Sequence, residues 1–302
     1  MPNYVTNTIT LKGKQSDIDS ICELLKNKNP DRDEEIDFNN VVPMPNTMNI
    51  AASSNARWYI ASYVKTLSDV ERLSLIQELC KYSDGFYESY AHKYQDAFTG
   101  DIPDDTLNRM QKTFQEEYSA INPNSIEEVG KTYIDNILNY GADTWYDWSC
   151  NNWGTKWGAM DSCISDNSIA FDTAWSAALP ITKKLSEIFP DVRFSHEWAD
   201  EDIGRNCGRY VYKGGVAISE YLPEGEEAIA FACYKWGYDE EEYGINMDDY
   251  DFRDIEQDNI DISDAGENLS LESRIALAKG VDPKEQAESV KTKNIELEQH
   301  LR

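Results

Sequence analysis

Alternation of hydrophobic and polar residues predicts strands at both ends of the first 237 residues. In residues 4–11 Val5, Ile9 and Leu11 share one face and the threonines the other, with Asn7 interrupting the hydrophobic face. This is the period of a half-buried strand. Residues 209–212 and 216–221 flank Gly214-Gly215 and predict a hairpin. Further strands are predicted over residues 36–42, 168–175 and 192–198.

Helical spacing of hydrophobic residues predicts three helices beside these strands and a separate helical block. Ser16 or Asp17 caps the first helix, Pro180 begins the second, and Gly237 ends the third. The block runs from about residue 55 to residue 140 and holds four candidate helices. The last of them opens with the capping box Ser125-x-x-Glu128.

The order of these elements predicts an α+β fold. Two strand–helix–strand units, residues 4–42 and 168–198, flank the helical block. Such a pair closes into one antiparallel sheet of the ferredoxin-like, split βαβ kind, with two separate small domains as the alternative. The predicted parts are a ferredoxin-like domain from residues 1–50 and 145–237, a large helical insertion over residues 51–144, and an acidic, partly disordered or helical C-terminal tail over residues 238–302.

The C-terminal tail is strongly acidic. Residues 239–267 contain 13 acids and one base, Arg253, which predicts a solvated and mobile segment. The whole chain has a formal charge of −28, which disfavours direct binding of nucleic-acid phosphates and favours a partner with a basic surface. The predicted partner-binding residues are Asp239, Glu240, Glu241, Glu242, Asp248, Asp249, Asp251, Trp153 and Trp157.

Residues 141–157 hold four of the eight tryptophans of the chain. Such a cluster either packs against a core or presents an apolar face to a partner. Two interpretations stay open: these rings seal the insertion onto the sheet, or they form an exposed binding face. An aromatic sheet face can also stack nucleobases, which here requires Trp153, Trp157, Trp175 and Trp198 to be exposed beside basic residues.

Four segments in this order carry a resemblance to a known family: N-Y-V-T-N-T-I-T-L-K-G, V-V-P-M-P, W-Y-D-W-S-C-N-N-W-G-T-K-W and F-D-T-A-W-S-A-A-L-P. Over residues 1–236 the chain resembles the YubB-like family of phage and conjugative-plasmid proteins. The resemblance implies a ferredoxin-like domain and an origin in a mobile element. It supplies no catalytic residues, because that family has no established activity.

Candidate catalytic and metal-binding residues are few. His196 on a strand face has the chemistry of a general base, although a histidine in that place is more often a core residue. Paired carboxylates run acid–base chemistry or hold Mg²⁺, but with 56 acids in the chain some cluster by chance. Six scattered cysteines without a C-x-x-C pair disfavour a zinc site, and we expect neither metal nor cofactor. The acids near the aromatic stretch and the later strands are Asp143, Asp147, Asp161, Asp172 and Asp200.

The predicted location is the cytoplasm, because the chain shows no basic leader before an apolar run and no stretch of about 18 apolar residues. The predicted function is that of a non-enzymatic phage or plasmid accessory protein that binds a basic surface of a host protein. Its concrete form is a nucleic-acid mimic that antagonises a host defence system. The alternatives are a nucleic-acid-binding accessory protein that uses the aromatic sheet face, and a hydrolase built on the aspartates. The sequence does not indicate an oligomeric state.

Overall fold

The structure is a computed structural model that describes residues 2–31, 33–81, 90, 92–99, 102–117, 125–250 and 252. The chain forms two compact units. The sheet unit comprises Met1–Pro43 and Asn152–Arg302, and the helical unit comprises Met44–Asn151. The helical unit is therefore inserted, along the chain, between two parts of the sheet unit.

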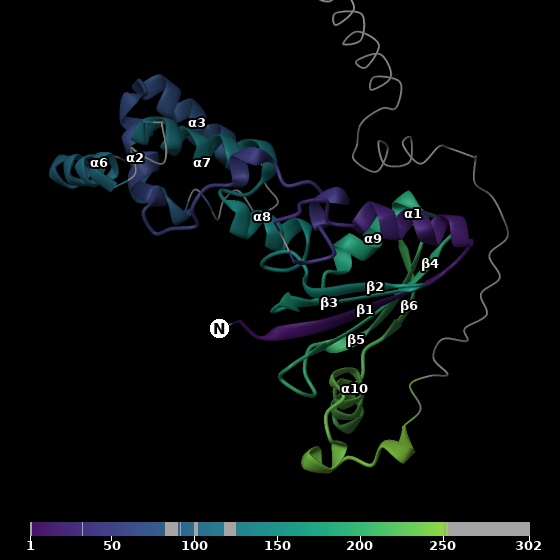
Figure 1. Ribbon diagram of the computed structural model, residues 1–302. Coiled ribbons are helices and arrows are strands. Elements are labelled where there is room, and N and C mark those ends of the chain that lie inside the picture. The colour runs from purple at the N-terminus through teal and green to yellow at the C-terminus, as the bar shows by residue number, and fades with distance from the viewer. Residues whose placement is uncertain are drawn as a thin grey trace, which may run out of the picture. The chain divides into compact units, whose positions relative to one another are not determined.

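The sheet unit contains a six-stranded antiparallel sheet in the order β2-β3-β1-β4-β5-β6 (Figure 1). The chain order β1-α1-β2-β3-α9-β4, with β1 between β3 and β4, is the split βαβ arrangement. The predicted α+β, ferredoxin-like fold is confirmed, and the hairpin β5–β6 widens the sheet beyond β4. The strands are β1 (Tyr4–Lys12), β2 (Met160–Ser165), β3 (Ser168–Ala174), β4 (Arg193–Asp200), β5 (Cys207–Lys213) and β6 (Val216–Tyr221).

Helices cover both faces of this sheet (Figure 1). Helices α1 (Gln15–Leu25) and α9 (Leu179–Ile188) lie on one face, and α10 (Glu226–Trp236) lies on the other. The alternation in β1 explains the arrangement, because its hydrophobic side chains and Asn7 are buried whereas its threonines are half-buried. Lys235 of α10 donates to the Thr8 hydroxyl, which places the threonines on the α10 face.

The strand predicted over residues 36–42 is wrong. Ile36 forms a single bridge with Lys26, and Phe38–Asn40 form a 3-10 helix, η1. The Asp37 carboxylate accepts a hydrogen bond from the Asn39 amide, which closes a turn where an extended strand was expected. The second strand of the ferredoxin-like unit is β2, which follows the insertion. It escaped prediction because it is a short edge strand with only two large hydrophobic side chains, Met160 and Ile164.

The predicted hairpin is confirmed. Gly214 and Gly215 form a two-residue turn between the paired residues Lys213 and Val216. Their φ angles are 58° and 79°, so both lie in the left-handed region that glycine adopts without steric cost. The turn therefore follows directly from the sequence.

The helical unit confirms the predicted helical block. Helix α7 begins after the capping box of Ser125 and Glu128, as predicted. Helices α2 and α7 cross closely, since a Cβ atom on Gly130 would lie 1.9 Å from the Tyr59 carbonyl oxygen. The helices are α2 (Ala56–Thr66), α3 (Asp69–Lys81), α5 (Gln95–Thr99), α6 (Asp104–Glu117), α7 (Ile126–Tyr140) and α8 (Trp145–Asn152), with the short 3-10 helix η2 at Asn46–Met48.

The beginning of the acidic tail, where a solvated and mobile segment is predicted, is described as far as residue 250 and at residue 252. It forms two short 3-10 helices, η3 (Glu240–Tyr243) and η4 (Met247–Asp249). Ile245 and Phe252 are buried there, so the segment gains hydrophobic contact that opposes the effect of its charge. The rest of the predicted tail, from residue 253 onward, lies outside the described residues. Among the residues that are described, no helix is both long and apolar enough to cross a membrane.

Candidate functional site

The acidic segment, residues 238–252, is anchored beside α10 through its hydrophobic residues. Ile245 and Phe252 belong to the same core cluster as Ala199 of β4 and Phe231 of α10. The Phe252 ring meets the Phe231 ring edge to face, with centroids 5.4 Å apart, and it stacks on Tyr250 at 5.9 Å. Buried aromatic pairs of this kind contribute beyond their area alone. The segment is therefore fixed at both of its anchoring positions.

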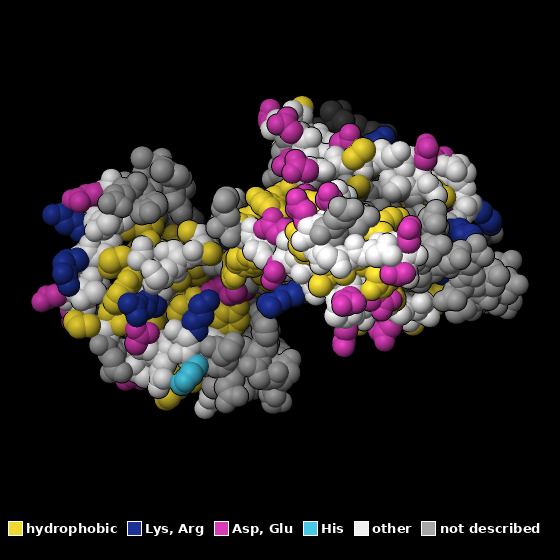
Figure 2. Space-filling model, turned by 90° about the horizontal axis from the view of Figure 1, so that it is seen from below, with side chains coloured by type: hydrophobic (Ala, Val, Ile, Leu, Met, Phe, Trp, Pro, Cys, Tyr) yellow, Lys and Arg dark blue, Asp and Glu magenta, His cyan; other side chains and the backbone are white. Residues whose placement is uncertain are grey.

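The carboxylates of the acidic segment point away from this core. Asp239, Glu242, Asp248 and Asp249 are exposed. Residues 239–250 contain six acids and no lysine or arginine. Figure 2 shows acidic side chains spread among hydrophobic ones on the face of the sheet unit turned to the viewer. Of the other predicted partner-binding acids, Glu240 and Glu241 lie in η3, where the structure describes only the backbone, and Asp251 lies outside the described residues.

Exposed tyrosines accompany these carboxylates. Tyr234, Tyr238 and Tyr243 have exposed fractions of 48%, 41% and 42%. Tyr238 stacks on Trp236, with ring centroids 5.9 Å apart. Aromatic faces attract lysine and arginine side chains, and carboxylates pair with them. The combination suits a basic protein surface.

A cluster of buried charges lies under the acidic segment. Arg209 of β5 donates from Nε to the Glu197 carboxylate at 2.8 Å, and Lys235 of α10 donates to the same carboxylate at 2.8 Å. Burial alone would raise the pKa of Glu197, but Lys235 and Arg209 lower it below its ordinary value. Arg209 also donates to the Phe252 carbonyl oxygen at 3.2 Å. The charge cluster thus links β4 and β5 to α10 and to the end of the segment.

The aromatic stretch divides into buried and exposed rings. Trp153 is 5% exposed, and its Nε1 donates to the Val42 carbonyl at 2.9 Å. The partner-binding role predicted for Trp153 is therefore wrong, because the core encloses the ring. Trp198 is also 5% exposed and stacks on Tyr210 at 5.6 Å. A nucleobase-stacking sheet face required both rings to be exposed, and the structure buries both.

Trp157 and Trp175 have a different setting. The Lys156 ammonium lies 4.6 Å from the centroid of each ring, so the lysine is held between the two tryptophans. Trp157 is half-buried and donates from Nε1 to the Met160 sulfur at 2.9 Å. Trp175 is 41% exposed and has a φ of 72°. That conformation costs a bulky residue about 1–3 kcal/mol and persists only where its surroundings impose it.

Hydrogen bonds tie the two loops of this lysine–tryptophan cluster together. The Thr155 hydroxyl donates to the Ala174 carbonyl at 2.9 Å, and the Ser176 hydroxyl donates to the Gly154 carbonyl at 2.8 Å. Gly154 has a φ of 79°, and a Cβ atom there would lie 2.6 Å from Pro180 Cδ. Asn206 donates to the Trp175 carbonyl at 3.1 Å. The cluster is therefore rigidly built, although the sequence separates its two halves.

The predicted aspartates do not converge on one site. Asp143 and Asp147 meet in the helical unit, where Lys93 donates to the Asp143 carboxylate at 2.8 Å and Tyr90 donates to Asp147 at 2.9 Å. The Tyr94 hydroxyl also donates to Asp143. Against the effect of burial, Lys93 lowers the pKa of Asp143, whereas burial and Asp143 raise that of Asp147. General acid–base chemistry needs a protonated acid beside a deprotonated base, and these opposite pKa shifts favour such a pair. However, Asp143 is 1% exposed, which gives the group the character of a buried ion-pair network.

The other three aspartates belong to the sheet unit. Asp200 accepts hydrogen bonds from Asn3 at 3.2 Å and from Asn206 at 3.1 Å, which fixes the end of β4. Burial raises the pKa of Asp172 in β3, and Asp161 is exposed in β2. Within the described residues no group of three or more histidines, cysteines and acids could hold a metal ion.

His196 is a core residue. It is fully buried, with Nδ1 2.7 Å from the Thr182 hydroxyl and Nε2 3.0 Å from the Asn7 side-chain oxygen. Burial, with a smaller effect of Lys235, lowers its pKa to about 3. The side chain therefore stays neutral at physiological pH and has no access to a substrate. Asn7, which interrupts the hydrophobic face of β1, is explained by this bond.

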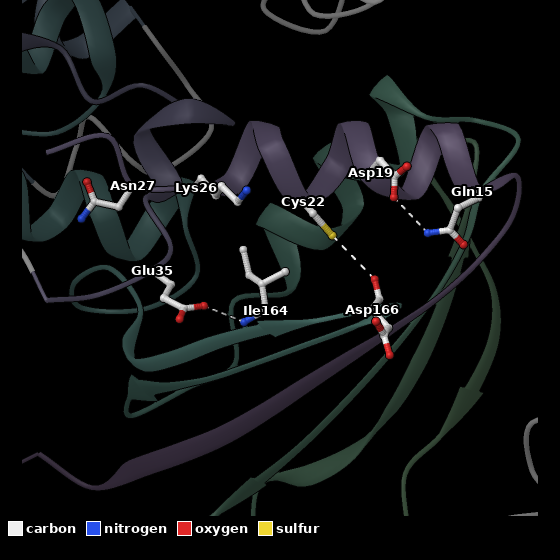
Figure 3. Close-up of a pocket in the computed structure, with 8 residues that line it drawn as sticks. All are labelled: Gln15, Asp19, Cys22, Lys26, Asn27, Glu35, Ile164 and Asp166. Carbon is white, nitrogen blue, oxygen red and sulfur yellow. Dashed lines mark hydrogen bonds between the residues drawn. The ribbon is translucent and has the colours of Figure 1, made fainter. Parts of the chain in front are cut away.

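A polar pocket of about 530 Å³ lies between α1 and β2 (Figure 3). Glu35 accepts a hydrogen bond from the Ile164 amide at 2.9 Å, so its carboxylate covers the free edge of β2. Burial raises the pKa of Cys22, which keeps that thiol protonated and unreactive. The lining residues are Gln15, Asp19, Cys22, Lys26, Asn27, Glu35, Ile164 and Asp166. This pocket protects a sheet edge and offers no group activated for chemistry.

Comparisons with known proteins give one solved structure and one family model that are similar to parts of the chain. The crystal structure of a protein api92 from Yersinia pseudotuberculosis is similar at 13% sequence identity and a TM-score of 0.34, over 74% of this chain and 99% of that chain. No curated protein matches the chain. Residues 152–248 match a family model described as "Ferredoxin-like domain in Api92-like protein". The matched region runs from the last residue of α8 into η4, so it includes the lysine–tryptophan cluster and most of the acidic segment. This part of the chain is thus similar to the ferredoxin-like domain of Api92-like proteins.

Proposed function

We propose that the chain is a non-enzymatic accessory protein of a phage or plasmid that binds a basic surface of a host protein in the host cytoplasm. The acidic segment, residues 238–252, is the proposed contact. More specifically, the chain imitates nucleic acid and so blocks a host defence protein that binds DNA. The resemblance of residues 1–236 to the YubB-like family motivates the mobile-element origin.

The observation that carries the proposal is the ordered placement of the exposed acids. Asp239, Glu242, Asp248 and Asp249 are exposed on a segment whose hydrophobic anchors, Ile245 and Phe252, are buried. A fixed array of carboxylates loses less conformational entropy on binding than a mobile tail does. The −28 charge of the chain also steers a basic partner toward it over roughly the Debye length of about 8–10 Å.

The test neutralises the array in the full-length protein. The variant carries Asp239→Asn, Glu242→Gln, Asp248→Asn and Asp249→Asn, and the matched control carries Asp33→Asn, Asp166→Asn, Asp191→Asn and Glu220→Gln at exposed positions elsewhere. Both remove four charges, so they separate position from total charge. Co-purification from bacterial lysate identifies the retained proteins, and titration with oligolysine gives a defined basic probe.

We expect the wild-type protein and the control to retain the same host protein and the array variant to lose it. Binding should weaken at least tenfold between about 50 and 500 mM salt, because exposed ion pairs are screened. Equal loss in both variants, or indifference to salt, would contradict the proposal. Gel-shift assays with single-stranded and duplex oligonucleotides test the alternative, since a mimic of nucleic acid should bind neither.

A further inference from the structure

We infer that Trp157 and Trp175 form a binding site for a cationic side chain of the partner, and that Lys156 occupies this site until the partner displaces it. The inference builds on the proposed function, because it adds a specific contact to the general attraction of a basic surface. It names the ligand chemistry as an alkylammonium or guanidinium group. The site lies in the sheet unit, within the region similar to Api92-like proteins.

The position of Lys156 shows that the two rings accept a cation. Its ammonium lies 4.6 Å from both ring centroids, inside the range of about 6 Å for attraction between a cation and the face of an aromatic ring. Two aromatic faces around one cation are the arrangement that recognises quaternary ammonium ligands. The lysine thus occupies the place of such a ligand.

The backbone conformation of Trp175 also indicates a binding role. At a φ of 72°, an ordinary fold would place glycine or asparagine, and this chain places its largest side chain there with 41% of it exposed. A core-packing role does not explain a ring that remains so exposed. Strained residues of this kind cluster at ligand sites, where the surrounding structure holds them. Here the bonds of Trp175 to Asn3 and Asn206 impose the conformation.

A cationic side chain of the partner can displace the Lys156 ammonium from the two rings. Its side chain is only half-buried, and attraction between an exposed lysine and an aromatic ring is weak. A primary ammonium is also strongly hydrated, so a guanidinium or a quaternary ammonium loses less on entering between the rings. Hydrogen bonds hold the two loops in place, so the lysine side chain can leave while both rings keep their positions.

The experiment uses the full-length protein with tetramethylammonium as the probe and sodium chloride as the ionic-strength control. The change in tryptophan fluorescence reports binding. Lys156→Met removes the resident cation, and Lys156→Arg keeps one. Trp175→Gly removes one ring and suits the left-handed backbone, which alanine would not. Lys184→Met, a change at a lysine that pairs with Glu187, is the matched control.

We expect Lys156→Met to bind tetramethylammonium about fivefold more tightly than the wild-type protein, since the loss of a weak competitor is worth about that factor. Lys184→Met should bind like the wild type, Lys156→Arg should bind more weakly because a guanidinium competes better for the rings, and adding Trp175→Gly to Lys156→Met should abolish binding. Equal affinity of Lys156→Met and wild type would overturn the inference, as would binding that survives Trp175→Gly. Circular dichroism of each variant establishes that it is folded.

This result is separable from the proposed function. The variant with four neutralised acids should bind tetramethylammonium like the wild type, because its tryptophans are intact. If tetramethylammonium fails to bind any variant while the acidic segment still retains a host protein, only the inference about the rings fails. If the rings bind the probe but no host protein is retained, the proposed function fails.

Discussion

The two faces of the sheet both bury polar groups, but they do so by different means. On the face of α1 and α9, the buried polar groups Asn7, Thr182 and His196 are neutral and satisfy one another. On the face of α10, Glu197 and Arg209 are charged, and a lysine completes the cluster. Protonation of His196 would destabilise the neutral face. Removal of one charged side chain would destabilise the charged face, because its partners would stay buried without a counter-charge. The charged face reaches the acidic segment through the bond from Arg209 to the Phe252 carbonyl.

The largest expected effect comes from breaking the charge cluster. Glu197→Gln leaves Arg209 and Lys235 buried without a counter-charge, which should lower the free energy of unfolding by about 3–5 kcal/mol. Urea denaturation at pH 7 measures it. Glu220→Gln, at an exposed position of β6, is the control and should change stability by less than about 0.5 kcal/mol. A loss below about 1 kcal/mol for Glu197→Gln would mean that water screens the cluster.

An intermediate loss of stability is expected at low pH, through His196 on the neutral face. His196 has a pKa of about 3 in the folded protein and 6.5 as its ordinary value, so only the unfolded chain takes up a proton in between. Stability from this group is complete above pH 6.5 and falls by about 1.4 kcal/mol per pH unit on going down toward pH 3. Between pH 6.5 and 4.5 the loss is roughly 2 kcal/mol. Denaturation at several pH values measures this slope.

The histidine variants identify the source of that slope. His196→Gln should remove it, and His92→Gln, at an exposed position, should retain it. A slope that persists unchanged in His196→Gln would assign the effect to other groups. If His196→Gln does not fold, NMR titration of the wild-type imidazole should find it neutral down to about pH 4, one unit above its pKa of about 3.

The smallest expected loss of stability comes from removing one hydrogen bond of the neutral face. Thr182→Val keeps the shape of the side chain but removes the hydroxyl that lies 2.7 Å from His196 Nδ1. One buried ring nitrogen then lacks a partner, which should cost about 1–2 kcal/mol. Thr132→Val in α7 removes an exposed hydroxyl bond to the Glu128 carbonyl, so it is the matched control and should cost less than about 0.5 kcal/mol. Thermal denaturation compares the two, and equal shifts would show that the hydroxyl bond to His196 is dispensable.

Much of the fold could be predicted because it depends on local pattern. The period-two alternation marked β1, β3 and β4, two glycines marked the β5–β6 turn, and the capping box marked the start of α7. The second strand could not be placed. Residues 36–42 have the hydrophobic content of a strand but close into a turn at Asp37, and β2 has the content of a loop but pairs with β3. Whether such a segment forms a strand depends on the strand it can pair with, which the local hydrophobic pattern does not show.

The candidate site was predictable only in part. The excess of acidic residues identified the acidic segment in the sequence. Its position depends on the packing of Ile245 and Phe252 against α10, and two hydrophobic residues hardly change the average composition of the segment. The contact of Lys156 with Trp175 joins two loops that the sequence separates by β2 and β3. The pairing of Glu197 with Arg209 required the register of β4 against β5. In each case a tertiary contact, absent from the local sequence, determines what the residue does.

The place of the insertion has a consequence for biosynthesis. The central strand β1 leaves the ribosome before the strands that pair with it, since the partners of Ile9 are Ile169 and His196. The helical unit lies between them in the chain and closes through contacts that are nearer in sequence, so we expect it to form earlier. Until β3 and β4 are made, β1 presents two unpaired edges. Translation that slows before residue 169 would therefore prolong the period in which this strand is open to aggregation.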